Sequence, residues 1–510
     1  MPSSANRFRP TPLVSSATCL AGLLLMGACT VGPDYVQPLT PTPDLWSAAV
    51  AGELSKEQPD IELWWTALGD TVLTELIRRA EVSSLDVAAA VARVREARAL
   101  RGIATGDNLP SLTLSGAYSR TRISENATQL PEGEPGEGEN GEEGAFENPS
   151  DFWSVGFDAS WEIDVFGRIR RQVEAATAEF QASIEDYRDV LVTLYAEVAA
   201  SYIDVRSSQA RIAFARSNAE GQRRSLQLTR DRFLAGLTSA LDVSQAESNL
   251  ANTEAAIPSL EIQLTFAKNR LAVLLGEPPG TLDELLDAPA PIPDPSEKIT
   301  VGMPGDLLRR RPDIRRAERR LAAQTARVGV ATADLYPRFS ILGVFGLESI
   351  DFSDLGKSAS IAWGIIPGFS WNIFQGGKIR NRIKVEYART DQALVAYELT
   401  VLTALEEVEN SLIAYARERI RRERLSDAAS ASQRSVELVR TQYLSGLTNF
   451  QNVLDTQRFL FQQQDELAAS EGQVVLNLIS LNKALGGGWA LEEPTAEQLS
   501  ARPVQEDGGR

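Results

Sequence analysis

The spacing of apolar residues predicts two very long α-helices. Residues 167–234 contain no proline, and the apolar positions within 169–205 recur every 3.6 residues on average, in ten steps over 36 residues. That period matches a nearly straight α-helix, which rises ~1.5 Å per residue and would here be on the order of 100 Å long. The stretch 377–444 has the same length and also lacks proline. Several such helices can pack side by side and form a tube. The alternative is that they form a solvated coiled coil that acts as a spacer.

Shorter helices flank each rod. Each long helix is followed by a brief break and a second helix, expected at 239–275 and 449–485. Pro258 lies inside the first of these and is expected to bend it. Helices at 85–106 and 313–333 are expected to lead into β-strands.

The two breaks carry signals for ending one helix and starting the next. Gly236 and Gly446 can take the positive φ that terminates a helix. After the first break Ser239 begins an S-x-x-D capping pattern, and after the second break Thr448 with Gln451 is expected to form the corresponding cap. A plain helical hairpin explains these residues fully.

Alternating apolar and polar residues predict four β-strands, two before each long helix. The alternation is clearest at 153–161, where Trp, Val and Phe fall on one face and Ser, Gly and Asp on the other. The stretch 361–371 repeats it, and weaker strands are expected at 112–118 and 339–347. A β-sandwich would show the same alternation. Aromatic residues at the strand ends, and no charge on the apolar face, favour strands that face lipid.

Four such strands imply more than one chain. Beyond residue 28 no run of 18 apolar residues exists, so no transmembrane helix is predicted. An open sheet in lipid would leave unpaired N–H and C=O groups at both edges, and about eight strands are the fewest that close a barrel. We therefore expect a barrel shared among chains, and the strands alone allow two, three or four copies.

The sequence also repeats itself. Residues 161–170 match 371–380 at an offset of 210 (371 − 161), whereas 102–110 match 329–337 at 227 (329 − 102). The first copy therefore has 17 extra residues (227 − 210) between its strands, where 129–148 is rich in Gly, Glu and Pro. That segment is expected to be an exposed acidic loop. A twofold repeat indicates one structural unit built twice.

Composition excludes several classes of function. The repeat spans most of the 510 residues, so we expect one duplicated body rather than a string of modules. A net charge of −18 argues against nucleic acid as a partner. Histidine is absent, which excludes Ser-His-Asp and Cys-His catalysis and HExxH zinc sites. We expect no enzyme activity, cofactor or metal site, and with only Cys19 and Cys29 no disulfide framework.

The N-terminus has the pattern of a bacterial lipoprotein signal. Arg7 and Arg9 form a positive region, 20–26 an apolar region, and small residues precede Cys29. We expect Cys29 to be acylated and to become the first mature residue; a buried or redox-active cysteine is the alternative. Thr30 follows instead of the aspartate of an inner-membrane retention signal, which indicates the outer membrane.

Six motifs together resemble one family. They are Cys29-Thr30-Val31-Gly32-Pro33-Asp34-Tyr35, Trp64-Trp65, Leu308-Arg309-Arg310-Arg311-Pro312-Asp313-Ile314, Ala317-Glu318, Ala331-Thr332-Ala333-Asp334-Leu335-Tyr336-Pro337 and Ala484-Leu485-Gly486-Gly487-Gly488-Trp489. The chain resembles the TolC-like outer-membrane factors of tripartite efflux pumps, specifically the NodT-type lipoproteins. The resemblance implies a homotrimer with a twelve-stranded outer-membrane barrel and a periplasmic α-helical tunnel. It also implies two partners, a periplasmic adaptor (membrane fusion protein) and an inner-membrane transporter of the resistance-nodulation-division type.

The resemblance further implies where function concentrates. The two helix breaks would form the periplasmic tip that contacts the adaptor, with Gly236, Leu237, Thr238, Asp242, Gly446, Leu447 and Thr448 as contact residues. Asp455 matches an acid that relatives place near the tunnel axis, and three copies would form a ring that favours cations. Asn452 and Gln451 lie where relatives place another acid or a gate residue. The resemblance therefore does not define the chemistry of the gate. The arginines within 309–320 would suit anionic ligands, but they fall in the family motif and are expected to be solvated or paired.

We therefore predict an α+β membrane protein with an internal duplication. Four transmembrane strands per chain complete a shared trimeric twelve-stranded β-barrel, and the long helices form a periplasmic α-barrel. The predicted parts are a signal peptide (1–28), an extended segment (29–66), a first repeat (67–276), an equatorial linker (277–304), a second repeat (305–489) and a flexible tail (490–510). The predicted function is a passive exit duct for small molecules. Alternatives are a duct for secreted proteins or for metal ions and, in a different class, a lipid-anchored periplasmic scaffold.

Overall fold

The computed structural model describes residues 30–43, 46, 62–124, 149–294 and 304–489. Cys29 and the predicted signal peptide, the acidic loop and the C-terminal tail lie outside these residues.

The chain divides into two compact units, and each takes residues from both halves of the sequence. Unit 1 comprises 1–36, 98–178 and 322–392, and unit 2 comprises 37–97, 179–321 and 393–510. Because each unit draws on both repeats, the chain is not a string of modules.

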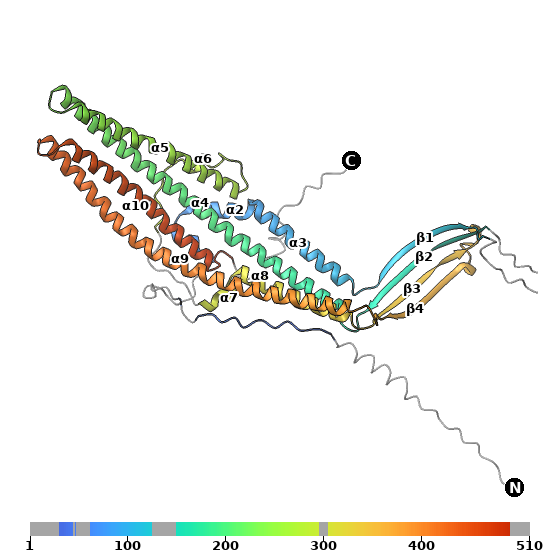
Figure 1. The fold of residues 1–510 in the computed structure, drawn as a ribbon. Coiled ribbons are helices and arrows are strands. Elements are labelled where there is room, and N and C mark those ends of the chain that lie inside the picture. Colours follow the sequence, from blue (N-terminus) through green and yellow to red (C-terminus); the bar gives the residue numbers. More distant parts are fainter. Residues whose placement is uncertain (1–29, 44–45, 47–61, 125–148, 295–303, 490–510) are drawn as a thin grey trace, which may run out of the picture. The chain divides into compact units, whose positions relative to one another are not determined.

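Unit 1 contains one antiparallel sheet of four strands (Figure 1). The strands are β1 (Ser111–Thr121), β2 (Ser150–Ile163), β3 (Arg338–Ser349) and β4 (Ile361–Ser370), and they neighbour one another in that order. All four predicted strands are confirmed. The first three extend beyond their expected ranges, and β4 ends one residue earlier than expected. The sheet leaves β1 and β4 with one unpaired edge each among the described residues.

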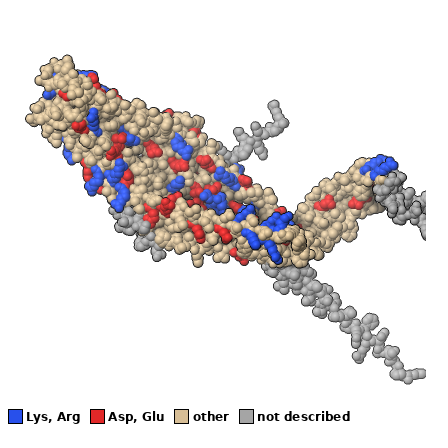
Figure 2. Space-filling model, in the orientation of Figure 1, with Lys and Arg blue, Asp and Glu red and all other residues tan. Residues whose placement is uncertain are grey.

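The predicted apolar face of the sheet is exposed. Phe157 on β2 is 45% exposed, and Trp363 and Ile365 on β4 are 73% and 70% exposed. On the face that Figure 2 shows, the strands are mostly uncharged, with a few acidic side chains and a basic group at one end. In water so large an apolar surface would be unfavourable, so this face is suited to contact with lipid or with another protein.

The centre of the sheet depends on two glycines. Gly156 on β2 pairs with Gly346 on β3 in the antiparallel register. A Cβ atom added at Gly156 would lie 2.8 Å from the Cα of Gly346, which is closer than real Cβ atoms approach. The two repeats therefore meet at a backbone contact that only glycine permits.

The segment 30–36 packs along unit 1. The guanidinium of Arg171, which is 4% exposed, donates to the carbonyl oxygen of Val31 at 3.2 Å and to the Asp34 carboxylate at 2.6 Å. Gly32 lies against Gly329 so closely that a Cβ atom would meet its Cα at 2.4 Å. Residues 30–36 thus form an extended strap held by one buried arginine.

Most of unit 2 is built from two helical hairpins that repeat the same lengths, and the first residues of both long helices belong to unit 1. Helices α4 (Arg168–Leu234) and α9 (Lys378–Leu444) have 67 residues each, and α5 (Ala240–Leu274) and α10 (Phe450–Ala484) have 35 each. Both starts differ by the predicted offset of 210 (378 − 168 and 450 − 240). Both long helices predicted from the apolar period are confirmed, as are α3 (Leu85–Gly106) and α8 (Pro312–Ala333). None of the described helices has an apolar stretch long enough to cross a bilayer.

The main core of unit 2 includes a helix that was not among the predicted elements. Helix α2 (Thr71–Ser83) buries its apolar side against α4 and α5, where Tyr202 and Leu271 are fully buried. Asp70 caps α2, because its Oδ1 accepts hydrogen bonds from Val72 N at 2.8 Å and Leu73 N at 3.0 Å. Its other oxygen accepts a 2.6 Å hydrogen bond from the Tyr202 hydroxyl, which ties the cap to the long helix.

Short helices complete unit 2. They are α6 (Asp283–Leu286) and α7 (Leu307–Arg310), with 3-10 turns at Trp64–Leu68 and Pro304–Asp306. Two further 3-10 turns, Phe352–Asp354 and Ser358–Ser360, lie in unit 1 between β3 and β4.

Candidate functional site

The turn between α4 and α5 has the predicted geometry. Gly236 has a φ of 73°, and the amide of Leu237 donates to the carbonyl oxygen of Arg232 at 2.8 Å, which closes the helix end. Ser239 and Asp242 form a reciprocal capping box at the start of α5, with both hydrogen bonds at 3.3 Å. The Thr238 hydroxyl donates to the same carboxylate.

The turn between α9 and α10 ends its helix in the same way but starts the next one differently. Gly446 also has a φ of 73°. The predicted cap at Thr448 with Gln451 is wrong, because Asn449 is the N-cap and its Oδ1 accepts from Asn452 N at 3.2 Å. The chain enters α10 one residue later than the pattern suggested, and asparagine caps a helix as well as serine or threonine does.

Apolar side chains protrude at both turns. The exposed leucines are Leu234, Leu237 and Leu241 at the first turn and Leu444 and Leu447 at the second, with exposures of 52% to 82%. Polar capping groups satisfy the backbone while these leucines remain in solvent. Clustered exposed apolar residues are typical of a surface that contacts another protein.

The two hairpins are joined just behind the turns. Phe450, Val453 and Leu454 of α10 pack with residues of the first hairpin in one buried cluster. The guanidinium of Arg232 lies 4.7 Å from the centre of the Tyr443 ring, and Arg458 Nε donates to Asn249 Oδ1 at 3.0 Å. These contacts couple the position of α10 to that of the first hairpin.

The three candidate gate residues lie on the side of α10 that faces away from this cluster. Gln451 and Asn452 are exposed and Asp455 is half-buried. Gln451 Nε2 donates to Asp455 Oδ1 at 3.0 Å, and Asn452 Nδ2 donates to Thr448 Oγ1 at 2.7 Å. The structure therefore brings the three together at the beginning of α10, within two turns of the helix break.

A polar layer between the hairpins was not predicted. Asn218 Nδ2 donates to Gln464 Oε1 at 2.6 Å, and Gln457 Nε2 donates to Ser225 Oγ at 2.7 Å. Gln222 is 3% exposed, and its amide has no hydrogen-bond partner among the described residues. The available signal was the spacing of polar residues at the buried, core-facing positions of α4. A buried amide without a protein partner, such as that of Gln222, is a site that suits a bound water.

No metal site accompanies these turns. In the described ranges no group of three or more His, Cys, Asp and Glu side chains is placed to hold a metal ion.

Comparisons with known proteins agree with this architecture. A family model described as outer membrane efflux protein matches residues 76–277 and 303–487. Nodulation protein T of Rhizobium leguminosarum bv. trifolii is 30% identical over 91% of this chain and 96% of that protein. Outer membrane protein OprJ of Pseudomonas aeruginosa is 30% identical over 91% of this chain and 94% of its own length. The solved structure of the outer-membrane channel OprN superposes with a TM-score of 0.82 at 36% identity, over 90% of this chain and all of that one. The chain therefore belongs to the outer membrane efflux protein family.

Proposed function

We propose that this chain, an outer membrane channel of an efflux pump, works as a passive homotrimeric exit duct for small molecules. The proposal rests on the four-stranded sheet of unit 1, whose two edges are unpaired among the described residues and whose apolar face is exposed. Four strands are too few to close a sheet in a membrane. Three copies supply twelve strands, with β1 of one protomer beside β4 of the next.

The helices of unit 2 support self-assembly as well. Helix α9 presents a row of exposed apolar side chains, which are Val395, Leu399, Leu402, Ile413 and Ile420, each between 47% and 62% exposed. Their spacing follows the helical period, so they form one stripe. Neighbouring protomers would cover this stripe and continue the ring of helices as a periplasmic tunnel.

The position of residue 30, at the start of the N-terminal strap, is consistent with a lipid anchor at Cys29. Val31 N donates to Phe166 O at 3.1 Å, three residues after β2 ends at Ile163. Thr30 packs directly against Gly167, where a Cβ atom would lie 2.2 Å from its methyl group. Cys29 directly precedes Thr30 in the sequence, so acylation of Cys29 would attach a lipid to the chain one residue before this contact.

We assign the helix turns to contact with a periplasmic adaptor, which would connect the duct to an inner-membrane transporter of the resistance-nodulation-division type. The exposed leucines offer an apolar surface to that partner. Some relatives are named as parts of toluene or solvent efflux pumps, which favours small molecules as cargo. One of them is the toluene efflux pump outer membrane protein TtgI of Pseudomonas putida, which is 31% identical over 92% of this chain.

Contact between the helix turns and an adaptor can be tested by measuring export. We expect Leu237→Asp combined with Leu447→Asp to abolish complementation of a deletion strain in drug and solvent tolerance, because two charges at each protomer's tip disrupt an apolar contact. The purified double variant should still conduct ions in planar bilayers at the wild-type level. A double variant that complements fully would remove these turns from adaptor contact, and a deletion strain with unchanged tolerance to all compounds would contradict the efflux function.

The gate assignment predicts a change in ion selectivity. Removing the three carboxylates with Asp455→Ala should raise single-channel conductance and reduce the preference for cations roughly fivefold, since three charges ~10 Å from the axis in water contribute about 1 kcal/mol. Reversal potentials in a KCl gradient across a planar bilayer measure this. Asp427→Ala, which removes an exposed carboxylate from α9, is the matched control. Equal selectivity for Asp455→Ala and wild type would remove Asp455 from the gate.

A further inference from the structure

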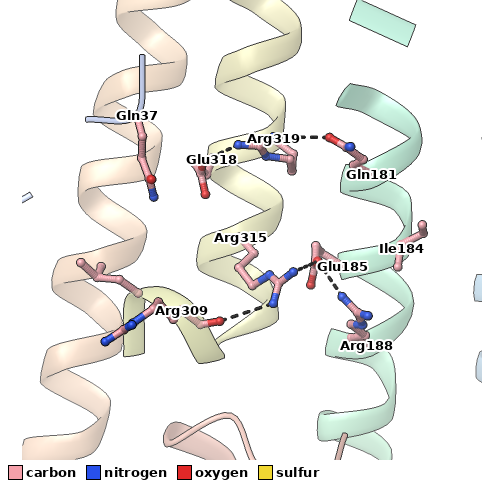
Figure 3. A pocket seen from close by; sticks show the side chains of 10 residues that line it. Gln37, Gln181, Ile184, Glu185, Arg188, Arg309, Arg315, Glu318 and Arg319 are labelled. Carbon is pink, nitrogen blue, oxygen red and sulfur yellow. Dashed lines mark hydrogen bonds and ion pairs between the residues drawn. The ribbon is translucent and has the colours of Figure 1, made fainter. Parts of the chain in front are cut away.

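A charged hollow in unit 2 lies apart from the helix turns. It measures about 630 Å³ and lies between α4 on one side and α7 with α8 on the other (Figure 3). Its lining residues are Gln37, Gln181, Ile184, Glu185, Arg188, Leu308, Arg309, Arg315, Glu318 and Arg319. Four arginines face two glutamates, which leaves two excess positive charges in a chain whose net charge is −18. Its volume is in the range of small-ligand sites.

A buried carboxylate lines the hollow on its α4 side. Glu185 is 5% exposed, and its Oε1 is paired with Arg188 Nη1 at 2.8 Å and with Arg315 Nη2 at 2.9 Å. Its Oε2 is also buried but has no hydrogen-bond partner among the described residues. Figure 3 shows Arg188 and Arg315 directed at Glu185 from α4 and α8. A buried carboxylate oxygen without a donor is costly, so a ligand that donates a proton there is favoured.

The cationic side chains are held in place before any ligand binds. The guanidinium groups of Arg188 and Arg315 lie 4.6 Å and 5.4 Å from the ring centre of Trp489. Arg319 is bonded to Glu318, and its Nη1 donates to Gln181 Oε1 at 3.4 Å. Stacking and pairing reduce the freedom that these long side chains would otherwise lose on binding.

We propose that this hollow binds a phosphate-type oxyanion that carries a proton. The guanidinium groups donate to the oxygens of the anion, and the excess positive charge compensates its negative charge. The P–OH group of the bound anion donates to Oε2 of Glu185, which satisfies the buried oxygen. The anion would bridge α4 of the first repeat and α8 of the second. Free phosphate and the headgroup of a phospholipid share this chemistry.

Proton sharing gives the site a characteristic dependence on pH. Burial raises the pKa of the Glu185 carboxyl, and the neighbouring Arg188 and Arg315 oppose that rise without cancelling it. The other charged groups that line the hollow are Arg309, on α7, and Glu318 and Arg319, on α8. Below the raised pKa Glu185 carries a proton itself and can donate to an anion that has none. Sulfate, which is unprotonated at neutral pH, should therefore bind only when Glu185 is neutral, whereas phosphate binds in both states.

The test measures anion binding to the full-length protein in detergent. Equilibrium dialysis with radiolabelled phosphate and sulfate is carried out at pH 8 and pH 4. We expect phosphate to bind at both values and sulfate to bind about tenfold or more tightly at pH 4, the difference of one charge-assisted hydrogen bond. Mixed micelles containing phosphatidylglycerol form a separate arm, and binding there that free phosphate fails to displace assigns the site to a lipid headgroup. Absence of saturable binding in every arm overturns the proposal, and equal sulfate affinity at both pH values overturns proton sharing.

Two variants locate the site. Arg319→Gln should weaken phosphate binding about tenfold. Arg320→Gln removes the same charge from the next residue of α8, which is exposed and does not line the hollow, and should change the affinity less than about twofold. Glu185→Gln places a permanent amide donor beside the anion and should make sulfate binding independent of pH. Equal losses in Arg319→Gln and Arg320→Gln would show general charge attraction and overturn the site.

Discussion

Gly346→Val should abolish assembly of the membrane pore. A Cβ atom at this position would lie 2.7 Å from the carbonyl oxygen of Val155 and 2.9 Å from the Cα of Gly156. Both atoms belong to the backbone of β2, so no side-chain rotation relieves the overlap. Overpacking alone costs about 1–3 kcal/mol, and separating β2 from β3 also breaks the ladder that joins the two repeats. We expect the amount of SDS-resistant oligomer in outer-membrane fractions, and drug tolerance, to fall at least ~tenfold.

Gly368→Val on β4 is the matched control for this substitution. A Cβ atom at Gly368 meets nothing within 4 Å in the chain. The same change in side-chain size on the same sheet should therefore leave most of the oligomer intact. If the Gly346 and Gly368 variants assemble equally well, the glycine contact between β2 and β3 does not limit the sheet.

Arg311→Ala should destabilise unit 2 by about 3–5 kcal/mol, the cost of removing one partner from a buried ion pair. Arg311 is 8% exposed and pairs with Asp313 at 2.6 Å and with Glu407 at 2.7 Å. Its Nη1 also donates to the carbonyl oxygen of Ala484 at 2.8 Å, where α10 ends. One guanidinium thus connects α8, α9 and α10. Guanidinium chloride unfolding of the detergent-purified protein, followed by circular dichroism, measures the loss.

Arg309 offers a control within the same motif. Its side chain is 85% exposed and approaches Asp306 only to 3.7 Å. Exposed ion pairs contribute about 0–1 kcal/mol, so Arg309→Ala should hardly change the unfolding midpoint. Equal destabilisation by the two substitutions would contradict the distinction between a buried and a solvated arginine in this run.

Most of the fold was predictable because its signals are long or repeated. A helical period sustained over tens of residues defines α4 and α9, and the duplication checks each element against its copy. Short elements lack that redundancy. Helix α2 has apolar residues at helical spacing and Asp70 as its cap, yet it is only 13 residues long and was missed. The cap at Asn449 was misplaced by one residue because Asn449 and Thr448 are both competent caps.

In the candidate site, only the features that depend on residues close together in the sequence were predictable. The positive φ of Gly236 and Gly446 and the capping box at Ser239 depend on neighbours in sequence, and these were predicted correctly except for the second cap. Contacts between the hairpins, such as Asn218 with Gln464, join residues more than 200 positions apart. The same holds for the cluster around Glu185, which draws on α4, α8 and the end of the described chain. Pairings of this kind depend on packing, and no single stretch of sequence carries them.

Several copies of the chain complete one pore that a single chain cannot close, and the number of chains in the native assembly can be measured. Native mass spectrometry of the protein extracted from outer membranes is the sharpest test, using wild type and a Cys29→Ser variant that cannot be acylated. We expect a species of three chains for the wild type and no stable folded monomer in water for the variant. A folded, water-soluble monomer of Cys29→Ser would rule out the shared pore.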